Sequence, residues 1–147
     1  MASGIKVDKG AFKTYDEDMK KKHNYKFLLF QLNKKMDKVV IVDQEKGDKK
    51  LNPSYDDFIK ALCVEGQPRW GVLDYEAKKK DGSILNKLVM FSWCQDTAAL
   101  RKKMLHGSTN NTVKSKLGIE TCFHASSPAD IEETVVMEKY GLETKTN

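Results

Sequence analysis

The stretch from Thr97 to Ile119 carries only positive charge, because every charged residue in it is basic. Surfaces that serve only solubility tend to mix both signs of charge. We therefore interpret this stretch as a binding face for an acidic partner, with an ordinary solvated helix surface as the alternative. Its cations are Arg101, Lys102, Lys103, Lys114 and Lys116.

The residue types that carry catalysis or bind metals form no recognisable pattern. His23, His106 and His124 share no close spacing with one another or with a cysteine, as a metal site would require. The sequence contains no GxxxxGK[ST] phosphate loop, no GxGxxG and no GxSxG elbow. We expect no cofactor, no metal and no enzymatic activity.

The cysteines indicate reduced core thiols rather than a disulfide framework or a zinc site. Cys63, Cys94 and Cys122 are odd in number and widely spaced. A free cysteine in a protein interior behaves as a small hydrophobic residue.

The overall charge favours an acidic partner without naming it. The chain has 26 basic and 21 acidic residues, a net charge of +5. Nucleic acid, anionic lipid and an acidic protein surface all remain open. Nucleic acid is the weaker alternative, because Trp70, Phe91 and Trp93 lie in apolar strand patterns and are not free to stack on bases.

The length of 147 residues fits one domain, 1–147, with a flexible segment at 1–6 and a frayed end at 141–147. The longest apolar runs fall far short of the ~20 residues of a membrane helix. The N-terminal sequence lacks the apolar stretch of a signal peptide. We expect a monomer in the cytoplasm, with the nucleus left open.

Helical and strand patterns alternate along the chain and predict an α/β fold, with one central mixed sheet sandwiched by helices. Strands are predicted over 25–32, 38–42, 69–76, 84–93 and 119–125, with an Asp81-Gly82 hairpin turn. Helices are predicted from Asp8 to about Lys22, from Asn52-Pro53-Ser54 to Leu62, from Thr97 to His106, for one or two turns before Gly118, and from Ser127 to about Tyr140. Gly107 is expected to stop the third helix and bend the chain.

The string WCQDTAALRKKM at Trp93–Met104 resembles the long-helix signature of the actin-depolymerising factor/cofilin family, which has a tryptophan, proline-aspartate, alanine and a basic-x-Lys-Met ending. The N-terminal MASG, the DYE at Asp74–Glu76 and the ending at Lys114–Gly118 support the resemblance. It implies the family's mixed sheet flanked by helices, and a long helix that inserts into the cleft between two outer subdomains of actin.

The resemblance also implies site residues. The implied contacts with monomeric actin are Ser3, Gly4, Arg101, Lys103 and Met104. The implied filament contacts are Lys78, Lys79, Lys80, Lys87 and Lys139. Phosphatidylinositol bisphosphate is implied as an inhibitor at Arg101, Lys102, Lys103, Lys114 and Lys116. Ser3 matches the serine whose phosphorylation inactivates family members, which implies a kinase and a phosphatase as partners.

The chain departs from the family pattern at three places, which bear on the details of the binding surface. Leu85 stands where a basic residue is common, Gln95 where proline is usual, and His106 to Thr109 where tyrosine-alanine-serine-serine is common. The leading hypothesis is a cytoskeletal protein that binds monomeric and filamentous actin, severs filaments and promotes depolymerisation. The alternative is a coactosin-like or glia-maturation-factor-like binder that does not sever.

Overall fold

A six-stranded mixed sheet organises residues 4–142, which are the residues that the computed structural model describes. The strand order is β1-β3-β2-β4-β5-β6, with parallel pairs at the two edges and antiparallel pairs between them. The strands are β1 (Lys6–Val7), β2 (Phe27–Leu32), β3 (Lys38–Val42), β4 (Arg69–Lys78), β5 (Ile84–Trp93) and β6 (Cys122–Ala125). The predicted fold class, a mixed sheet between helices, is confirmed.

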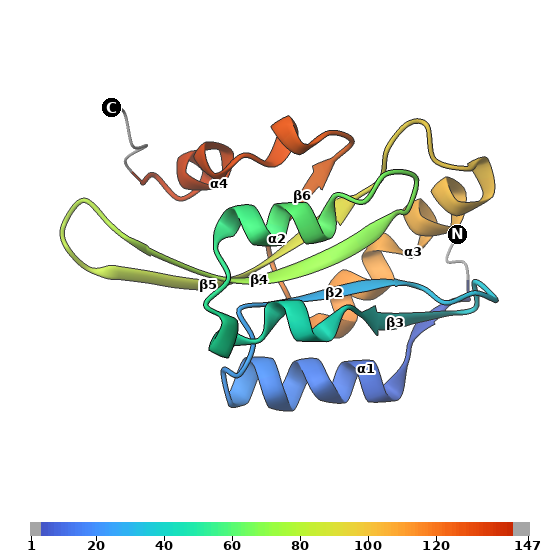
Figure 1. Cartoon of the computed structure of the whole chain (residues 1–147), viewed down its shortest axis with the longest axis horizontal. Coiled ribbons are helices and arrows are strands. Elements are labelled where there is room, and N and C mark those ends of the chain that lie inside the picture. The colour runs from blue at the N-terminus through green and yellow to red at the C-terminus, as the bar shows by residue number, and fades with distance from the viewer. Residues whose placement is uncertain (1–3, 143–147) are drawn as a thin grey trace.

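Helices cover both faces of this sheet and define two apolar cores (Figure 1). The helices α1 (Lys9–Lys13) and α3 (Leu100–Leu117) pack on one face, and α2 (Tyr55–Leu62) and α4 (Glu133–Lys139) on the other. Shorter helical segments are η1 (Thr14–Lys21), η2 (Gln44–Gly47), η3 (Lys49–Leu51) and η4 (Pro128–Ile131). None of the helices within residues 4–142 combines the length and the hydropathy needed to span a bilayer.

Capping side chains start the first two helices where the sequence predicts. The Asp8 carboxylate accepts hydrogen bonds from Gly10 N and Ala11 N at 3.0 and 3.1 Å. Ser54 and Asp57 form a reciprocal capping box, with Asp57 N donating to Ser54 Oγ and Ser54 N donating to Asp57 Oδ2. Such caps satisfy backbone N–H groups that the first helical turn leaves unpaired.

Helix α3 corrects the prediction of two helical pieces separated at Gly107. It is one helix of 18 residues that begins at Leu100, not Thr97, and passes through Gly107 without a break. One exposed glycine costs only about 1 kcal/mol of helix stability, and the buried face, with Thr109, Val113 and Leu117, keeps the helix on the sheet. Gly118 ends it in the left-handed conformation, as predicted.

Residues at both ends of the described part of the chain pack into the fold. Ile5 is buried and Lys6 lies in β1, within the segment expected to be flexible. Leu142 is buried in the core of the α2 and α4 face, whereas residues 143–147 and 1–3 lie outside the described part. The last helix is divided, because extended backbone at Glu132 separates η4 from α4. The final strand is also shorter than predicted, since β6 begins at Cys122.

A buried polar network fixes α3 to the sheet. Trp70 on β4 stacks on His106 of α3, with ring centroids 4.1 Å apart, and donates its indole N–H to Asn110 Oδ1 at 2.7 Å. Ser92 on β5 donates to the same oxygen at 2.8 Å and lies 2.8 Å from His106 Nε2. Ser92 donates its single hydroxyl proton to Asn110, so it can only accept a hydrogen bond from His106. His106 is therefore protonated at Nε2, which donates to Ser92 Oγ.

The network leaves His106 neutral and its Nδ1 without a hydrogen-bond partner among residues 4–142. Burial, with the nearby His124 as a smaller cause, lowers the pKa of His106 to about 3. An ionised imidazole would lack water and a counter-charge here.

Alanine at Gly71 should destabilise the protein. A β carbon there would lie 2.7 Å from the Phe58 ring, because α2 packs directly on β4 at this glycine. We expect the Gly71→Ala variant to lose about 1–3 kcal/mol of unfolding free energy in urea denaturation. Gly107→Ala is the matched control: its β carbon meets no atom within 4 Å, and removing a mid-helix glycine should gain about 0.5–1 kcal/mol. A destabilised Gly107→Ala variant would contradict the continuous helix.

Acidification should destabilise the fold through His106. In the unfolded chain, His106 takes up a proton as the pH falls below the ordinary imidazole pKa of about 6.5. In the folded chain, His106 stays neutral until about pH 3. The unfolding free energy should therefore fall with decreasing pH, more steeply in the wild type than in His106→Gln, by about 1.4 kcal/mol per pH unit between pH 6 and 4.5. Urea titrations at several pH values measure the difference, and equal slopes would show that His106 ionises freely in the folded protein.

Candidate functional site

The exposed side of α3 carries two apolar side chains one helical turn apart. Leu100 and Met104 have exposed fractions of 72% and 64%, among the large hydrophobic residues that the fold leaves in solvent. Residues four apart lie on the same helix face, so the pair forms one apolar strip near the start of α3. Met104 is a predicted actin contact, and Leu100 enlarges the exposed apolar surface beside it.

Cations flank this strip. Arg101 is exposed and makes no ion pair within residues 4–142. The Lys103 ammonium donates to the Asp96 carbonyl at 2.9 Å, which holds its side chain against the loop before α3. The structure thus brings Arg101, Lys103 and Met104 together at one end of the helix, with no acidic residue in its first turn.

Lys102 points to a different neighbour. Its ammonium donates to Gln67 Oε1 at 3.3 Å, in the segment that precedes β4. Lys102 and Lys103 therefore reach two different loops, although they are adjacent in sequence. The predicted basic face is thus divided into a part that contains Lys102 and a part that contains Lys103.

The remaining cations lie at the far end of the same helix. Lys114 and Lys116 are in its last turn, and the Lys116 ammonium sits 4.5 Å from the centre of the Phe12 ring. Lys103 and Lys114 are about 17 Å apart along the axis at 1.5 Å per residue. The five residues predicted to bind phosphoinositide thus form two groups and not one compact cluster.

The loop that precedes α3 is tied to the segment after α2. The Gln95 side chain accepts a hydrogen bond from Gly66 N at 2.7 Å, and Trp93 donates its indole N–H to the Val64 carbonyl at 2.9 Å. Proline at position 95 could not make the first of these bonds. Gln95 replaces the rigidity of a proline with a side-chain bond, a contact that the sequence pattern did not reveal.

The predicted filament contacts lie far from the α3 strip. Lys78, Lys79 and Lys80 are exposed at the tip of the β4–β5 hairpin, which projects beyond the helices (Figure 1). Lys87 is exposed on β5, and Lys139 ends α4. Leu85 is 7% exposed and belongs to the apolar core, so its position is used for packing.

Other predicted residues fall outside the strip or outside the described chain. Gly4 is exposed with a φ of 81°, a conformation that suits glycine. Ser3 lies outside the described residues. The Cys63, Cys94 and Cys122 thiols are free and half-buried. Burial raises the pKa of Cys63 to about 12 and that of Cys122 to about 11, so neither is a reactive thiolate at neutral pH.

His106 and His124, far apart in sequence, line one pocket of about 300 Å³, and His124 is the smaller cause of the lowered pKa of His106. Ser92 also lines that pocket, but its proton is committed to Asn110, so His106 does not activate it as a nucleophile. Within residues 4–142, no three His, Cys, Asp or Glu side chains are placed to hold a metal ion.

Comparisons with known proteins agree with this architecture. The family described as cofilin/tropomyosin-type actin-binding protein matches residues 4–141. Actin-depolymerizing factor 2, isoform c, of Caenorhabditis elegans is 33% identical, with 92% of this chain and 93% of the relative covered.

Solved structures show the same fold. The crystal structure of Streptomyces griseoflavus cofilin has a TM-score of 0.76 and 26% identity, with 92% of this chain and 96% of that chain covered. Human coactosin-like protein, solved by NMR, has a TM-score of 0.72 at 16% identity, with 100% and 97% covered, and this likeness concerns the fold alone. The match over residues 4–141 and the 33% identity show that this chain belongs to the cofilin/tropomyosin-type actin-binding protein family.

Proposed function

We propose that this chain binds monomeric and filamentous actin through α3, severs filaments and promotes loss of subunits. The observation that carries the proposal is the exposed Leu100–Met104 strip flanked by Arg101 and Lys103. An apolar helix face with cations beside it suits insertion into a groove with an acidic rim. The relative in Caenorhabditis elegans is named an actin-depolymerizing factor, which supports the direction of the effect.

Severing would need a second contact with a neighbouring filament subunit. The hairpin lysines Lys78 to Lys80, with Lys87 and Lys139, are exposed on other elements than α3 and could supply it. A protein that binds a twisted filament better than a straight one shifts filaments toward the twisted state. Filament strain then follows from binding alone, without any bond being made or broken by this chain.

Two regulatory inputs belong to the same proposal. Phosphorylation of Ser3 would add about two negative charges to the N-terminal segment, and like-charge repulsion would weaken binding to an acidic partner. Phosphoinositide would compete at the α3 cations. Because these cations form two groups about 17 Å apart, an anionic membrane surface fits them better than one headgroup.

Filament cosedimentation with quantified soluble actin, together with imaging of single filaments, tests the central proposal. Binding with shortening or increased soluble actin supports a severing and depolymerising protein. Binding to filament sides without shortening favours the coactosin-like alternative. No cosedimentation, with binding to nucleic acid that falls steeply with salt, would replace the proposal with the nucleic-acid alternative.

Removing both charges from the start of α3 should abolish tight binding to monomeric actin. We expect the double variant Arg101→Gln/Lys103→Gln to bind at least about 30-fold more weakly, as loss of about 2 kcal/mol at an interface hot spot implies. Titration of fluorescent monomeric actin measures the affinity. Lys50→Gln/Lys60→Gln, which removes two exposed charges on the α2 side, is the matched control. Unchanged affinity in the first variant would refute the assignment of α3.

The apolar strip should matter for binding and not for folding. Met104→Ser removes a side chain that is already 64% exposed, so the melting temperature should stay within about 1–2 °C of wild type. Affinity for monomeric actin should fall at least about tenfold, because the side chain leaves water only in the complex. Leu51→Ser, at an equally exposed leucine before α2, controls for the loss of surface hydrophobicity. Equal affinities of the two variants would contradict the groove model.

A further inference from the structure

A separate pocket of about 260 Å³ lies where the β2–β3 turn, the segment before β4 and the first turn of α3 meet. The apolar part of its lining is Leu32, Met36 and Pro68. Cavities that take drug-sized ligands usually start at about 300 Å³. The pocket therefore suits a smaller molecule.

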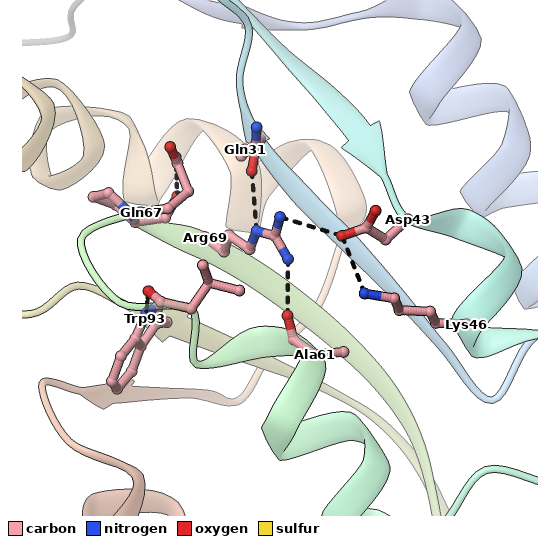
Figure 2. Close-up of polar contacts among 9 residues, drawn as sticks. Gln31, Asp43, Lys46, Ala61, Gln67, Arg69 and Trp93 are labelled. Atoms are coloured by element: carbon pink, nitrogen blue, oxygen red, sulfur yellow. Dashed lines mark hydrogen bonds and ion pairs between the residues drawn. The ribbon is translucent and has the colours of Figure 1, made fainter.

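The hydrogen bonds of Arg69 determine which polar atoms of Gln31 remain free to bind a ligand. Its guanidinium is almost buried and donates to Gln31 Oε1 at 3.0 Å and to the Ala61 carbonyl at 2.8 Å, beside Asp43 at 3.3 Å. Figure 2 shows the Gln31 oxygen facing Arg69 and the amide nitrogen directed away from it. Because a guanidinium can only donate, the oxygen must occupy this position. Gln31 lines the pocket, and its Nε2 donates no hydrogen bond within residues 4–142.

The other amides of the pocket have their acceptors occupied. Gln67 Oε1 accepts from the Lys102 ammonium, while its nitrogen donates to the Pro68 carbonyl. Asn33 Oδ1 accepts from the backbone N–H groups of Asp37 and Lys38, at 3.0 and 3.2 Å. Every amide oxygen in the lining is therefore already bonded.

The charges in the pocket are of one sign. Lys34 and Lys102 line it from the β2–β3 turn and from α3, and no acidic side chain lines it. The Lys102 ammonium has three protons and, within residues 4–142, one hydrogen-bond acceptor, Gln67 Oε1. The polar side chains thus offer hydrogen-bond donors and positive charge, beside an apolar wall.

We propose that this pocket binds a small organic anion, a carboxylate attached to an apolar body of about ten heavy atoms or fewer. The carboxylate would accept from Gln31 Nε2 and from the Lys34 and Lys102 ammonium groups, and the apolar body would lie against Leu32, Met36 and Pro68. Charge-assisted hydrogen bonds of this kind are about twice as strong as neutral ones.

The site is distinct from the actin face proposed above. Lys102 occupies the unspecified position of the basic-x-Lys-Met pattern, between Arg101 and Lys103. It turns toward Gln67, whereas Lys103 bonds to the Asp96 carbonyl. Binding of the anion therefore does not depend on actin binding by Arg101, Lys103 and Met104, although Lys102 is also one of the cations predicted to bind phosphoinositide.

Titration of the ¹⁵N-labelled protein with benzoate, followed by NMR chemical shifts, tests the proposal. Benzoate has a carboxylate and an apolar ring of suitable size. We expect saturable shifts confined to the β2–β3 turn, the segment before β4 and the first turn of α3. Benzyl alcohol, with the same ring and no charge, and inorganic phosphate, with charge and no ring, should each bind at least fivefold more weakly than benzoate.

Two variants examine the donors. Gln31→Glu keeps an oxygen for Arg69 but replaces the free donor with a second acceptor, and should weaken benzoate binding at least tenfold without unfolding the protein. Lys34→Gln/Lys102→Gln should weaken it at least fivefold. Lys35→Gln, adjacent to Lys34 but outside the pocket lining, is the matched control and should stay within twofold of wild type.

Three results would overturn the proposal. They are the absence of saturable benzoate shifts, benzoate binding that Gln31→Glu leaves unchanged in the folded protein, and binding of benzyl alcohol or phosphate as tight as that of benzoate. Circular dichroism of each variant shows that it is folded.

Discussion

Trp70 of β4 fixes α3, the helix that carries the proposed binding face, to the sheet. Its indole N–H donates to Asn110 and its ring stacks on His106, while Ser92 joins the same two side chains. A buried network of this kind specifies one arrangement, because each polar group would be costly without its partner. The rotation of α3 about its own axis follows from it, and so does the exposure of Leu100 and Met104 on the opposite side.

A fixed rotation also explains why adjacent basic residues have different roles. Successive residues of a helix are separated by about 100°, so Lys102 and Lys103 cannot face the same neighbour. One reaches Gln67 beside the donor-lined pocket, and the other reaches the Asp96 carbonyl beside the apolar strip. The basic stretch that appears continuous in the sequence is therefore two surfaces with different environments.

The sequence predicts those features that depend on local chemistry. The Asp8 cap, the Ser54 helix start and the mixed α/β architecture are confirmed because each depends on side-chain type within a few residues. The predicted break of α3 at Gly107 was wrong, since tertiary packing overrides the weak local preference of Gly107. The pocket beside Lys102 could not be predicted, because Gln31 and Gln67 meet α3 only through the long-range pairing of β2 with β4.

The first turn of α3 breaks the usual rules for a helix start. Ala99 at the N-cap offers no side-chain acceptor, no acidic residue follows, and three cations lie next to the positive end of the helix dipole. Like charge at this end costs about 0.3–1 kcal/mol per residue. Contacts of Lys102 and Lys103 with oxygen acceptors offset part of that cost. A helix start that keeps its cations and unpaired N–H groups in solvent is unfavourable alone and becomes favourable against an acidic surface, which is the kind of local conflict that natural sequences retain at binding sites.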